Sequence, residues 1–362
     1  MDIRFAIGLC CLCLLNFSCA PYGVASQVNP RFLYSANLYD NSITIYLIDD
    51  RSGNLTVLGD VAAGDGPRAL AIHPSGDYLY VTHLHANTVA RYVIDKITGG
   101  LTHQPPDVAT QEIPEAVAIT PNGRYLYVAN AYTDSLSAYR VSRDGGLHEI
   151  GVYASGDYPL AIAIEPSGRY AYVANYLSDT AAVFGIDADS GELTLLSKVA
   201  TGAQPSAIVV DKHGDNLYIA NGISSTIHSF RIDTDSGALL PLGEFAAPLY
   251  PYALALSPSQ AHLYSANFGT DDVAAYALNK RDGGLRHLMS HDSDSGPFAV
   301  SVHPDGRYLY IANVRANSIS IYGIGTDSAV LQLKRTVPTR PGVAALILHD
   351  PSSDTSPTCA AF

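Results

Sequence analysis

The sequence has no Trp, only 2 Met and few charged residues: 15% of its 362 residues are charged, whereas 47% are hydrophobic. Acidic residues outnumber basic ones by 34 to 21, and the Lys and Arg residues form no cluster along the chain. A protein that follows a phosphate backbone needs such a cluster, so we expect no nucleic-acid partner. Beyond residue 26 no stretch repeats its apolar residues with a helical period, so we expect no helices.

The five Cys residues of the sequence imply no disulfide framework. Cys10, Cys11 and Cys13 lie within an apolar run, Phe5 to Phe17. That run is shorter than the roughly 20 residues of a membrane-spanning helix and is typical of a secretory signal. We therefore expect residues 1–25 to be a signal peptide and the protein to be exported, to the periplasm or the cell surface.

Two cleavage sites remain open for this signal. Cys19 follows Leu15-Asn16-Phe17-Ser18, which is similar to a loose bacterial lipoprotein box, and cleavage before Cys19 would attach a lipid to it. Ordinary cleavage after Ala25 would leave no lipid. We expect membrane contact only through this anchor.

At the other end, residues 351–362 are rich in Ser, Pro and Thr and are predicted to be a disordered tail.

A phrase that starts with Tyr recurs seven times along the chain, at intervals of 45 to 47 residues. Its copies are Tyr34 to Asn37, Tyr80 to His83, Tyr127 to Asn130, Tyr172 to Asn175, Tyr218 to Asn221, Tyr264 to Asn267 and Tyr310 to Asn313. A fixed period of this length indicates a repeat fold in which each unit buries its apolar face against its neighbours.

The unit from Gly156 to Thr201 shows what repeats. Its apolar runs are Pro159 to Pro166, Tyr170 to Asn175, Ala181 to Ile186 and Leu193 to Val199, separated by turn residues. Such runs, rich in Val, Ile and Tyr, are typical of antiparallel strands. Seven units of four strands predict an all-β, seven-bladed β-propeller over residues 31–350. The missing Trp excludes the propeller class built on tryptophan-aspartate repeats.

The pattern of the innermost strand indicates how the ring closes. It begins at Pro67, Pro114, Pro159, Pro205, Pro251 and Pro297, and no copy precedes the first Tyr phrase. The missing copy is Val343 to His349, which aligns with Pro67 to His73. We predict that this C-terminal segment joins the blade whose other strands come from residues 31–62, which removes open sheet edges.

In this fold the start of each innermost strand and the loop after each second strand meet at one mouth of the channel. We call it the proline mouth. Its variable residues are the candidates for ligand recognition. The predicted ligand-binding residues are Tyr39, Tyr132, Tyr176, Tyr252, Phe268, Phe298 and Arg315.

Four residues at this mouth are the predicted catalytic group: Arg68, His83, His85 and Glu115. Arg68 is suited to hold a carboxylate or a lactone carbonyl, and a His or Glu115 to activate water. The alternative is an exposed Arg68–Glu115 ion pair flanked by solvated histidines. His83 and His85 lack a further ligand for a metal, and no other motif indicates a cofactor, so we expect neither.

The Asn that ends six of the seven Tyr phrases is better explained by the architecture than by one site, since Asn bonds backbone groups at the start of a loop. The hairpins 187–191 and 233–237 are rich in Asp but have no Glu at the twelfth position of a calcium loop. We interpret them as tight turns.

Units such as YVANAYTDSLSAYRVSRDGGL (Tyr127 to Leu147) and GAQPSAIVVDKHGDNLYIAN (Gly202 to Asn221) resemble the seven-bladed lactonase-like propellers, which include 6-phosphogluconolactonases, and the proteins with Tyr-Val-Thr-Asn repeats. The phrase Gly66-Pro67-Arg68 resembles the one in which the enzymes of this family carry a functional Arg. Two family positions differ, because Ala69 and Leu84 stand where a His and a Glu are often found.

Two functions remain open. The first is an exported binding module that presents the proline mouth to a protein or carbohydrate ligand. The second is a carboxylic ester hydrolase, as the resemblance implies, acting on an unphosphorylated lactone. A sugar phosphate lactone is a cytosolic metabolite that an exported protein would not meet, and a phosphate also favours several cationic donors.

Overall fold

The computed structural model describes residues 30–279, 281–325 and 330–351. The predicted signal peptide, Cys19 and the predicted tail after Pro351 lie outside the described residues. Within them the structure consists of strands, turns and loops without a helix, as predicted. The described residues accordingly offer no helix long and apolar enough to span a membrane.

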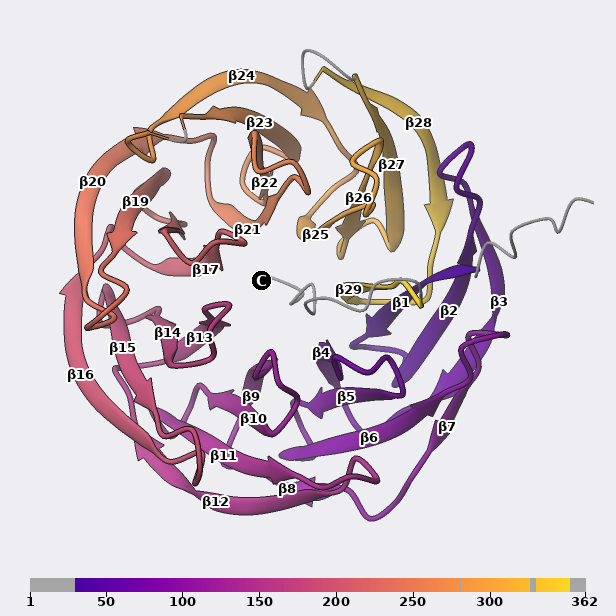
Figure 1. Ribbon diagram of the computed structural model, residues 1–362. Coiled ribbons are helices and arrows are strands. Elements are labelled where there is room, and N and C mark those ends of the chain that lie inside the picture. The colour runs from indigo at the N-terminus through magenta and orange to yellow at the C-terminus, as the bar shows by residue number, and fades with distance from the viewer. Residues whose placement is uncertain (1–29, 280, 326–329, 352–362) are drawn as a thin grey trace, which may run out of the picture.

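The strands form seven antiparallel sheets around a central channel, which Figure 1 views end-on. From the channel outward, blade 1 consists of β29 (Val343–His349), β1 (Arg31–Asn37), β2 (Ser42–Ile48) and β3 (Leu55–Ala62). Blade 2 consists of β4 (Pro67–Ile72), β5 (Tyr78–His83), β6 (Thr88–Ile94), β7 (Leu101–His103) and β8 (Val108–Ala109). Blade 3 consists of β9 (Pro114–Ile119), β10 (Tyr125–Asn130), β11 (Ser135–Val141) and β12 (Leu147–Ala154).

The other four blades follow the same order. Blade 4 consists of β13 (Pro159–Ile164), β14 (Tyr170–Asn175), β15 (Thr180–Ile186) and β16 (Leu193–Ala200). Blade 5 consists of β17 (Pro205–Val210), β18 (Asn216–Asn221), β19 (Thr226–Ile232) and β20 (Leu239–Ala246). Blade 6 consists of β21 (Pro251–Leu256), β22 (His262–Asn267), β23 (Asp272–Leu278) and β24 (Leu285–Asp292). Blade 7 consists of β25 (Pro297–Val302), β26 (Tyr308–Asn313), β27 (Ser318–Ile324) and β28 (Leu331–Pro338).

The ring closes as predicted, because β29 pairs with β1. The register places Phe32 opposite His349 and Asn37 opposite Val343. Figure 1 shows the last described strand beside the first at the inner edge of blade 1. The two ends of the propeller therefore share one sheet, and this pairing closes the ring.

Blade 2 departs from the predicted four strands because its outermost strand is split into β7 and β8. Pro105 and Pro106 lie in the break, and neither has an N–H to donate to β6. The break places Asp107 beside His103, with 2.6 Å between the carboxylate Oδ1 and the imidazole Nε2. It also brings the Asp107 carboxylate near the imidazole of His83, a residue of the candidate site.

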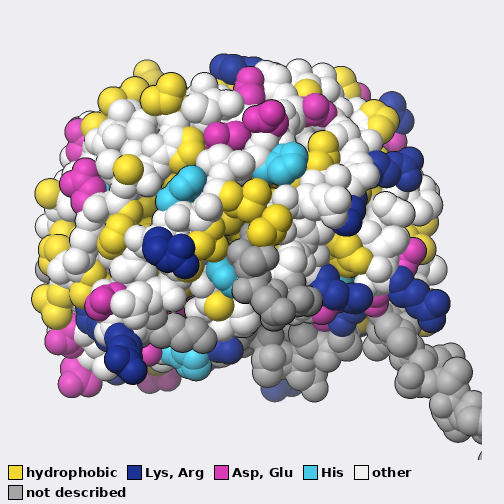
Figure 2. Space-filling view, turned by 90° about the horizontal axis from the view of Figure 1, so that it is seen from above, with side chains coloured by type: hydrophobic (Ala, Val, Ile, Leu, Met, Phe, Trp, Pro, Cys, Tyr) yellow, Lys and Arg dark blue, Asp and Glu magenta, His cyan; other side chains and the backbone are white. Residues whose placement is uncertain are grey.

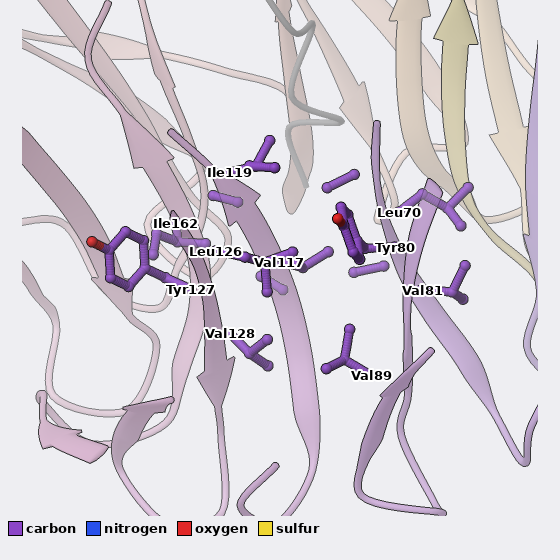
Figure 3. Close-up of a cluster of buried hydrophobic side chains, with 14 of the residues drawn as sticks. Leu70, Tyr80, Val81, Val89, Val117, Ile119, Leu126, Tyr127, Val128 and Ile162 are labelled. Carbon is purple, nitrogen blue, oxygen red and sulfur yellow. The ribbon is translucent and has the colours of Figure 1, made fainter. Parts of the chain in front are cut away.

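The first Tyr of each repeated phrase is buried, and in five of the seven phrases its hydroxyl joins one blade to the next. Figure 3 shows Tyr80 and Tyr127 among apolar side chains such as Val117 and Leu126. The Tyr80 hydroxyl donates to the carbonyl of Gly145, in the hairpin of the next blade, at 2.9 Å. Equivalent bonds link Tyr34 to Gly99, Tyr127 to Gly191, Tyr172 to Gly237 and Tyr310 to Gly53. These bonds explain why a large side chain with a polar tip recurs there.

Acidic, basic and hydrophobic side chains are interspersed on the side of the disc shown in Figure 2. No basic patch appears on that side, which agrees with the scattered Lys and Arg residues of the sequence.

Candidate functional site

The proline mouth is assembled by a repeated hydrogen bond between blades. A short polar residue in the loop after the second strand has a left-handed backbone, and its side chain accepts a hydrogen bond from the residue before the next innermost strand. Asp134 Oδ1, for example, accepts from Tyr158 N at 2.8 Å. The other five such pairs are Asn41 with Gly66, Asn87 with Ile113, Asp179 with Gln204, Asp271 with Gly296, and Asn317 with Gly342. These bonds fix where six of the seven innermost strands begin.

Arg68 spans the channel at this mouth. Its Nε donates to Glu115 Oε2 of the neighbouring blade 3 at 2.6 Å, and its Nη2 donates to the Tyr252 hydroxyl of blade 6 at 3.0 Å. Arg68 is 3% exposed and Glu115 7% exposed. Burial by itself would lower the pKa of Arg68, but the charge of Glu115 and the contact with Tyr252 outweigh burial and raise it. Arg68 is therefore a fixed positive charge between two blades.

Aromatic rings cover this guanidinium. The Arg68 Cζ lies 4.7 Å from the centroid of the Phe298 ring, and Phe298 stacks on Tyr252 at a centroid distance of 4.1 Å. Phe268 lies 6.1 Å from Phe298, and the Arg315 Cζ lies 4.0 Å above the Phe268 ring. Cation–π contacts of this kind hold the charged groups against the rings.

A cleft of about 400 Å³ opens beside these rings. We call it the aromatic cleft. It is lined by Leu38, Tyr39, Phe268, Phe298, Val314, Arg315, Asn317 and Pro341, from blades 1, 6 and 7. Four predicted ligand-binding residues, Tyr39, Phe268, Phe298 and Arg315, thus share one cleft. The volume lies within the roughly 300 to 1,000 Å³ of small-molecule sites.

The other predicted ligand-binding residues lie around the same mouth. Tyr252 bonds Arg68, as described, and the Tyr176 hydroxyl forms a hydrogen bond with the hydroxyl of Tyr250. Tyr132 is 68% exposed at the rim, and Tyr39 is 70% exposed at the edge of the aromatic cleft. The mouth therefore combines buried polar groups at its base with exposed aromatic rings at its edge.

Sequence reasoning missed two tyrosines at the base of the mouth. The Tyr158 hydroxyl lies 3.5 Å from Glu115 Oε1, and Tyr250 stacks with Tyr252 at 6.3 Å. Both have left-handed backbones, with φ of 57° and 54°. Burial raises the pKa of each hydroxyl, so both are protonated at neutral pH. The sequence does contain a signal for this backbone conformation, because blades 1, 2 and 7 have Gly at the same position, directly before the innermost strand.

The structure joins only part of the predicted catalytic group. Arg68 and Glu115 form the ion pair of the alternative interpretation, but this pair is buried rather than exposed. His83 is fully buried, so it is not the solvated flank of that alternative. His85 is exposed at the rim, with its Nδ1 3.4 Å from Asp65 Oδ1. Catalytic roles for the two histidines stay predictions.

His83 takes the place that Asn has in the other blades. Its Nε2 accepts a hydrogen bond from Gly64 N at 3.1 Å, so the proton resides on Nδ1, which lies 3.1 Å from Thr88 Oγ1. Asn175 makes the matching contacts in blade 4, where Oδ1 accepts from Gly156 N and Nδ2 donates to Thr180. Burial lowers the pKa of His83, although nearby Asp107 acts in the opposite direction.

The Asn column is architectural, as predicted. All six Asn side chains are fully buried; five of their amides donate to neighbouring hydroxyl groups, and that of Asn267 donates to the Asp272 carboxylate. The described residues also contain no group of three or more His, Cys, Asp or Glu that could hold a metal ion.

The sequence matches the family described as Lactonase, 7-bladed beta-propeller over residues 23–113, 102–210, 159–251 and 198–300. No curated protein matches it.

Solved structures with the same fold include a candidate 6-phosphogluconolactonase from Bacteroides uniformis, with a TM-score of 0.81 and 20% identity over 88% of this chain and 99% of the other. A periplasmic gluconolactonase from Pseudomonas aeruginosa has a TM-score of 0.80 and 20% identity over 88% and 99%. A protein from Lactobacillus plantarum has a TM-score of 0.78 and 22% identity over 88% and 99%. At these identities the likeness establishes the fold. The family match spans most of the chain, and this protein therefore belongs to the lactonase family of seven-bladed β-propellers.

Proposed function

We propose that this protein hydrolyses lactones that carry no phosphate group, at the proline mouth. The observation that carries the proposal is the Arg68 guanidinium, held between Glu115 and Tyr252 beneath the aromatic cleft. Membership of the lactonase family supports a ring-opening reaction. The fold alone supports no particular substrate.

The proposed chemistry uses groups that already meet at the base of the mouth. Water attacks the lactone carbonyl carbon while the Glu115 carboxylate accepts a proton from that water. Arg68 and the Tyr158 hydroxyl stabilise the negative charge that develops on the carbonyl oxygen. The bond between the carbonyl carbon and the ring oxygen then breaks, and the ring oxygen takes the proton from Glu115. The product is a hydroxy acid.

Access to Arg68 requires a movement of Phe298, since this ring lies over the guanidinium. In our proposal Phe298 turns aside when the lactone enters from the aromatic cleft. Arg315, which is exposed and lies over Phe268, is placed to bind the carboxylate of the product.

The lining of the aromatic cleft argues against a phosphorylated substrate. Arg315 is its single cationic residue, and Arg68 is already paired with Glu115. A phosphate dianion favours several cationic donors at once. We therefore expect glucono-1,5-lactone to have a kcat/KM at least about tenfold higher than its 6-phosphate, a difference of ~1.4 kcal/mol in transition-state binding.

The test measures hydrolysis of a panel of lactones by the purified protein, above the spontaneous rate. Glu115→Gln should lower kcat by about 10²-fold or more, the usual contribution of a general base. Glu192→Gln is the matched control, because Glu192 is exposed in the hairpin between β15 and β16 and is not a residue of the proline mouth. Circular dichroism confirms that both variants fold. The proposal fails if no lactone is hydrolysed, or if Glu115→Gln turns over at the normal rate.

A role as a binding module is a second candidate, favoured by one observation. Leu177 and Ile223 are 59% and 60% exposed in the loops of blades 4 and 5, which, like Tyr132, face the proline mouth. Exposed apolar residues around a cavity are typical of contact surfaces. Calorimetric binding of a carbohydrate or lactone without turnover would support this candidate over the enzyme.

We also propose that residues 1–25 direct export. The mass of the mature protein purified from a bacterial envelope tests this proposal. A chain that starts at Cys19 with added lipid, or at Ser26, supports export, whereas a full-length soluble chain contradicts it.

A further inference from the structure

A second hollow lies at the mouth opposite the proline mouth, where the innermost strands end. Its volume is about 620 Å³. Each innermost strand contributes a Val, Leu or Ile near its last residue, from Ile72 in β4 to Leu348 in β29. We call this hollow the channel cavity. Its wall along the innermost strands is a ring of aliphatic side chains, and polar residues such as Ser75, Asp211 and Gln260 line it at the rim.

The channel cavity is closed towards the proline mouth. It shares no lining residue with the aromatic cleft. The second residue of each innermost strand lies between the two hollows, and there Arg68 reaches Tyr252 across the axis. Phe298 packs on both of them. The channel cavity is thus a blind funnel, open at one end.

Two of the charged residues at the rim of the funnel, Lys96 and Asp350, are paired. The Lys96 ammonium lies 2.7 Å from the Asp77 carboxylate, and Arg31 Nε lies 3.0 Å from Asp350. His349 lines the funnel and is only 3% exposed. Burial, together with the nearby Lys96 ammonium, lowers the pKa of His349 to about 4, so the ring is neutral at pH 7. The charged residues that line the funnel, Lys96, Asp211, Lys212 and Asp350, carry no net charge together, so the rim favours an ionic ligand of neither sign.

We propose that the channel cavity binds an uncharged small molecule with an apolar body. The cavity has the volume of a small-molecule site, and such sites are mostly apolar with few polar groups. Water binds weakly to an aliphatic wall, so an apolar ligand displaces it at little cost. The proposal is independent of lactone hydrolysis, because the blocked channel separates the two sites.

Nile red, an uncharged fluorescent dye, is the probe for this site. Titration into the full chain should give saturable binding to one site. Leu256→Asp and Val210→Asp each place a carboxylate in the wall, at half-buried positions that tolerate it. Each should raise the Kd of the dye at least tenfold. Leu196→Asp, on the exposed outer strand β16, is the matched control and should leave the Kd unchanged.

Three results would overturn the proposal. One is equal dye binding by the wild type and both wall variants. The second is tighter binding of the anionic dye 8-anilinonaphthalene-1-sulfonate than of Nile red. The third is dye binding only by a chain that ends at Pro351, which would show that residues 352–362 occupy the cavity themselves. Lactone hydrolysis by the wall variants should stay at the wild-type rate, which separates this proposal from the proposed function.

Discussion

Arg68 of blade 2 and Tyr252 of blade 6 meet across the channel, with 3.0 Å between the guanidinium Nη2 and the hydroxyl oxygen. They are 184 residues apart in the chain. The contact closes the channel, positions the charge at the proline mouth and separates two hollows of different chemistry.

Replacing Arg68 should destabilise the protein strongly. Arg68→Met leaves the Glu115 carboxylate buried without its charge partner, which typically costs about 3 to 5 kcal/mol. The free energy of unfolding, from urea titration, measures the loss. Adding Glu115→Leu to Arg68→Met should recover part of it. Arg340→Met, which breaks an exposed pair with Asp60, should have a much smaller effect, and equal losses in the two single variants would contradict the buried ion pair.

His83→Asn should preserve both stability and any hydrolysis. Asn is the residue of this column in the other six blades, and it can accept from Gly64 N and donate to Thr88 as His83 does. His83→Ala should cost about 1 to 3 kcal/mol, because the Gly64 N–H loses its acceptor. Thermal unfolding and lactone turnover distinguish a scaffold role of His83 from a catalytic one. Lost turnover in a stable His83→Asn protein would instead establish a catalytic His83.

Stability should fall as the pH drops from about 6.5 to about 4. His349 is neutral when folded, because burial and Lys96 lower its pKa to about 4, whereas the unfolded chain binds a proton near the ordinary value of 6.5. The unfolded state therefore binds more protons in this interval, and the free energy of unfolding decreases as pH falls. The full effect of this one group is about 3 kcal/mol.

The variant His349→Phe isolates this contribution. It keeps an aromatic ring next to Phe32 and Tyr34, whose centroids lie 6.4 and 6.3 Å away. The slope of unfolding free energy against pH should be shallower in the variant between pH 4 and 6.5. An identical slope would assign the acid sensitivity to other buried histidines such as His83.

Tyr310→Phe should weaken the closure of the ring. The Tyr310 hydroxyl donates to the Gly53 carbonyl at 3.0 Å and joins blade 7 to blade 1. Its removal should cost about 1 kcal/mol, the usual net value of one hydrogen bond. Tyr39→Phe is the matched control, since this ring is exposed. Equal melting temperatures for Tyr310→Phe and the wild type would show that packing alone holds these blades together.

The strands of blade 4 illustrate how much of the fold could be predicted. The predicted run Tyr170 to Asn175 is β14, and the run Leu193 to Val199 is β16 with one residue more. The split outer strand of blade 2 was not predicted, because the effect of Pro105 and Pro106 depends on which backbone groups β6 offers. The candidate site was predicted in part: Arg68 and Glu115 meet, whereas Tyr158 and Tyr250 were missed.

The sequence by itself determined the number of blades and the closure by Val343 to His349, because each repeat encodes the same strands and turns. Only the tertiary structure decided that Arg68 crosses to Tyr252, that His83 serves as a scaffold residue and that an aliphatic funnel lies behind them. The reason is physical. A repeat specifies local backbone and interblade packing, whereas side chains that meet across the channel belong to different repeats and follow no period.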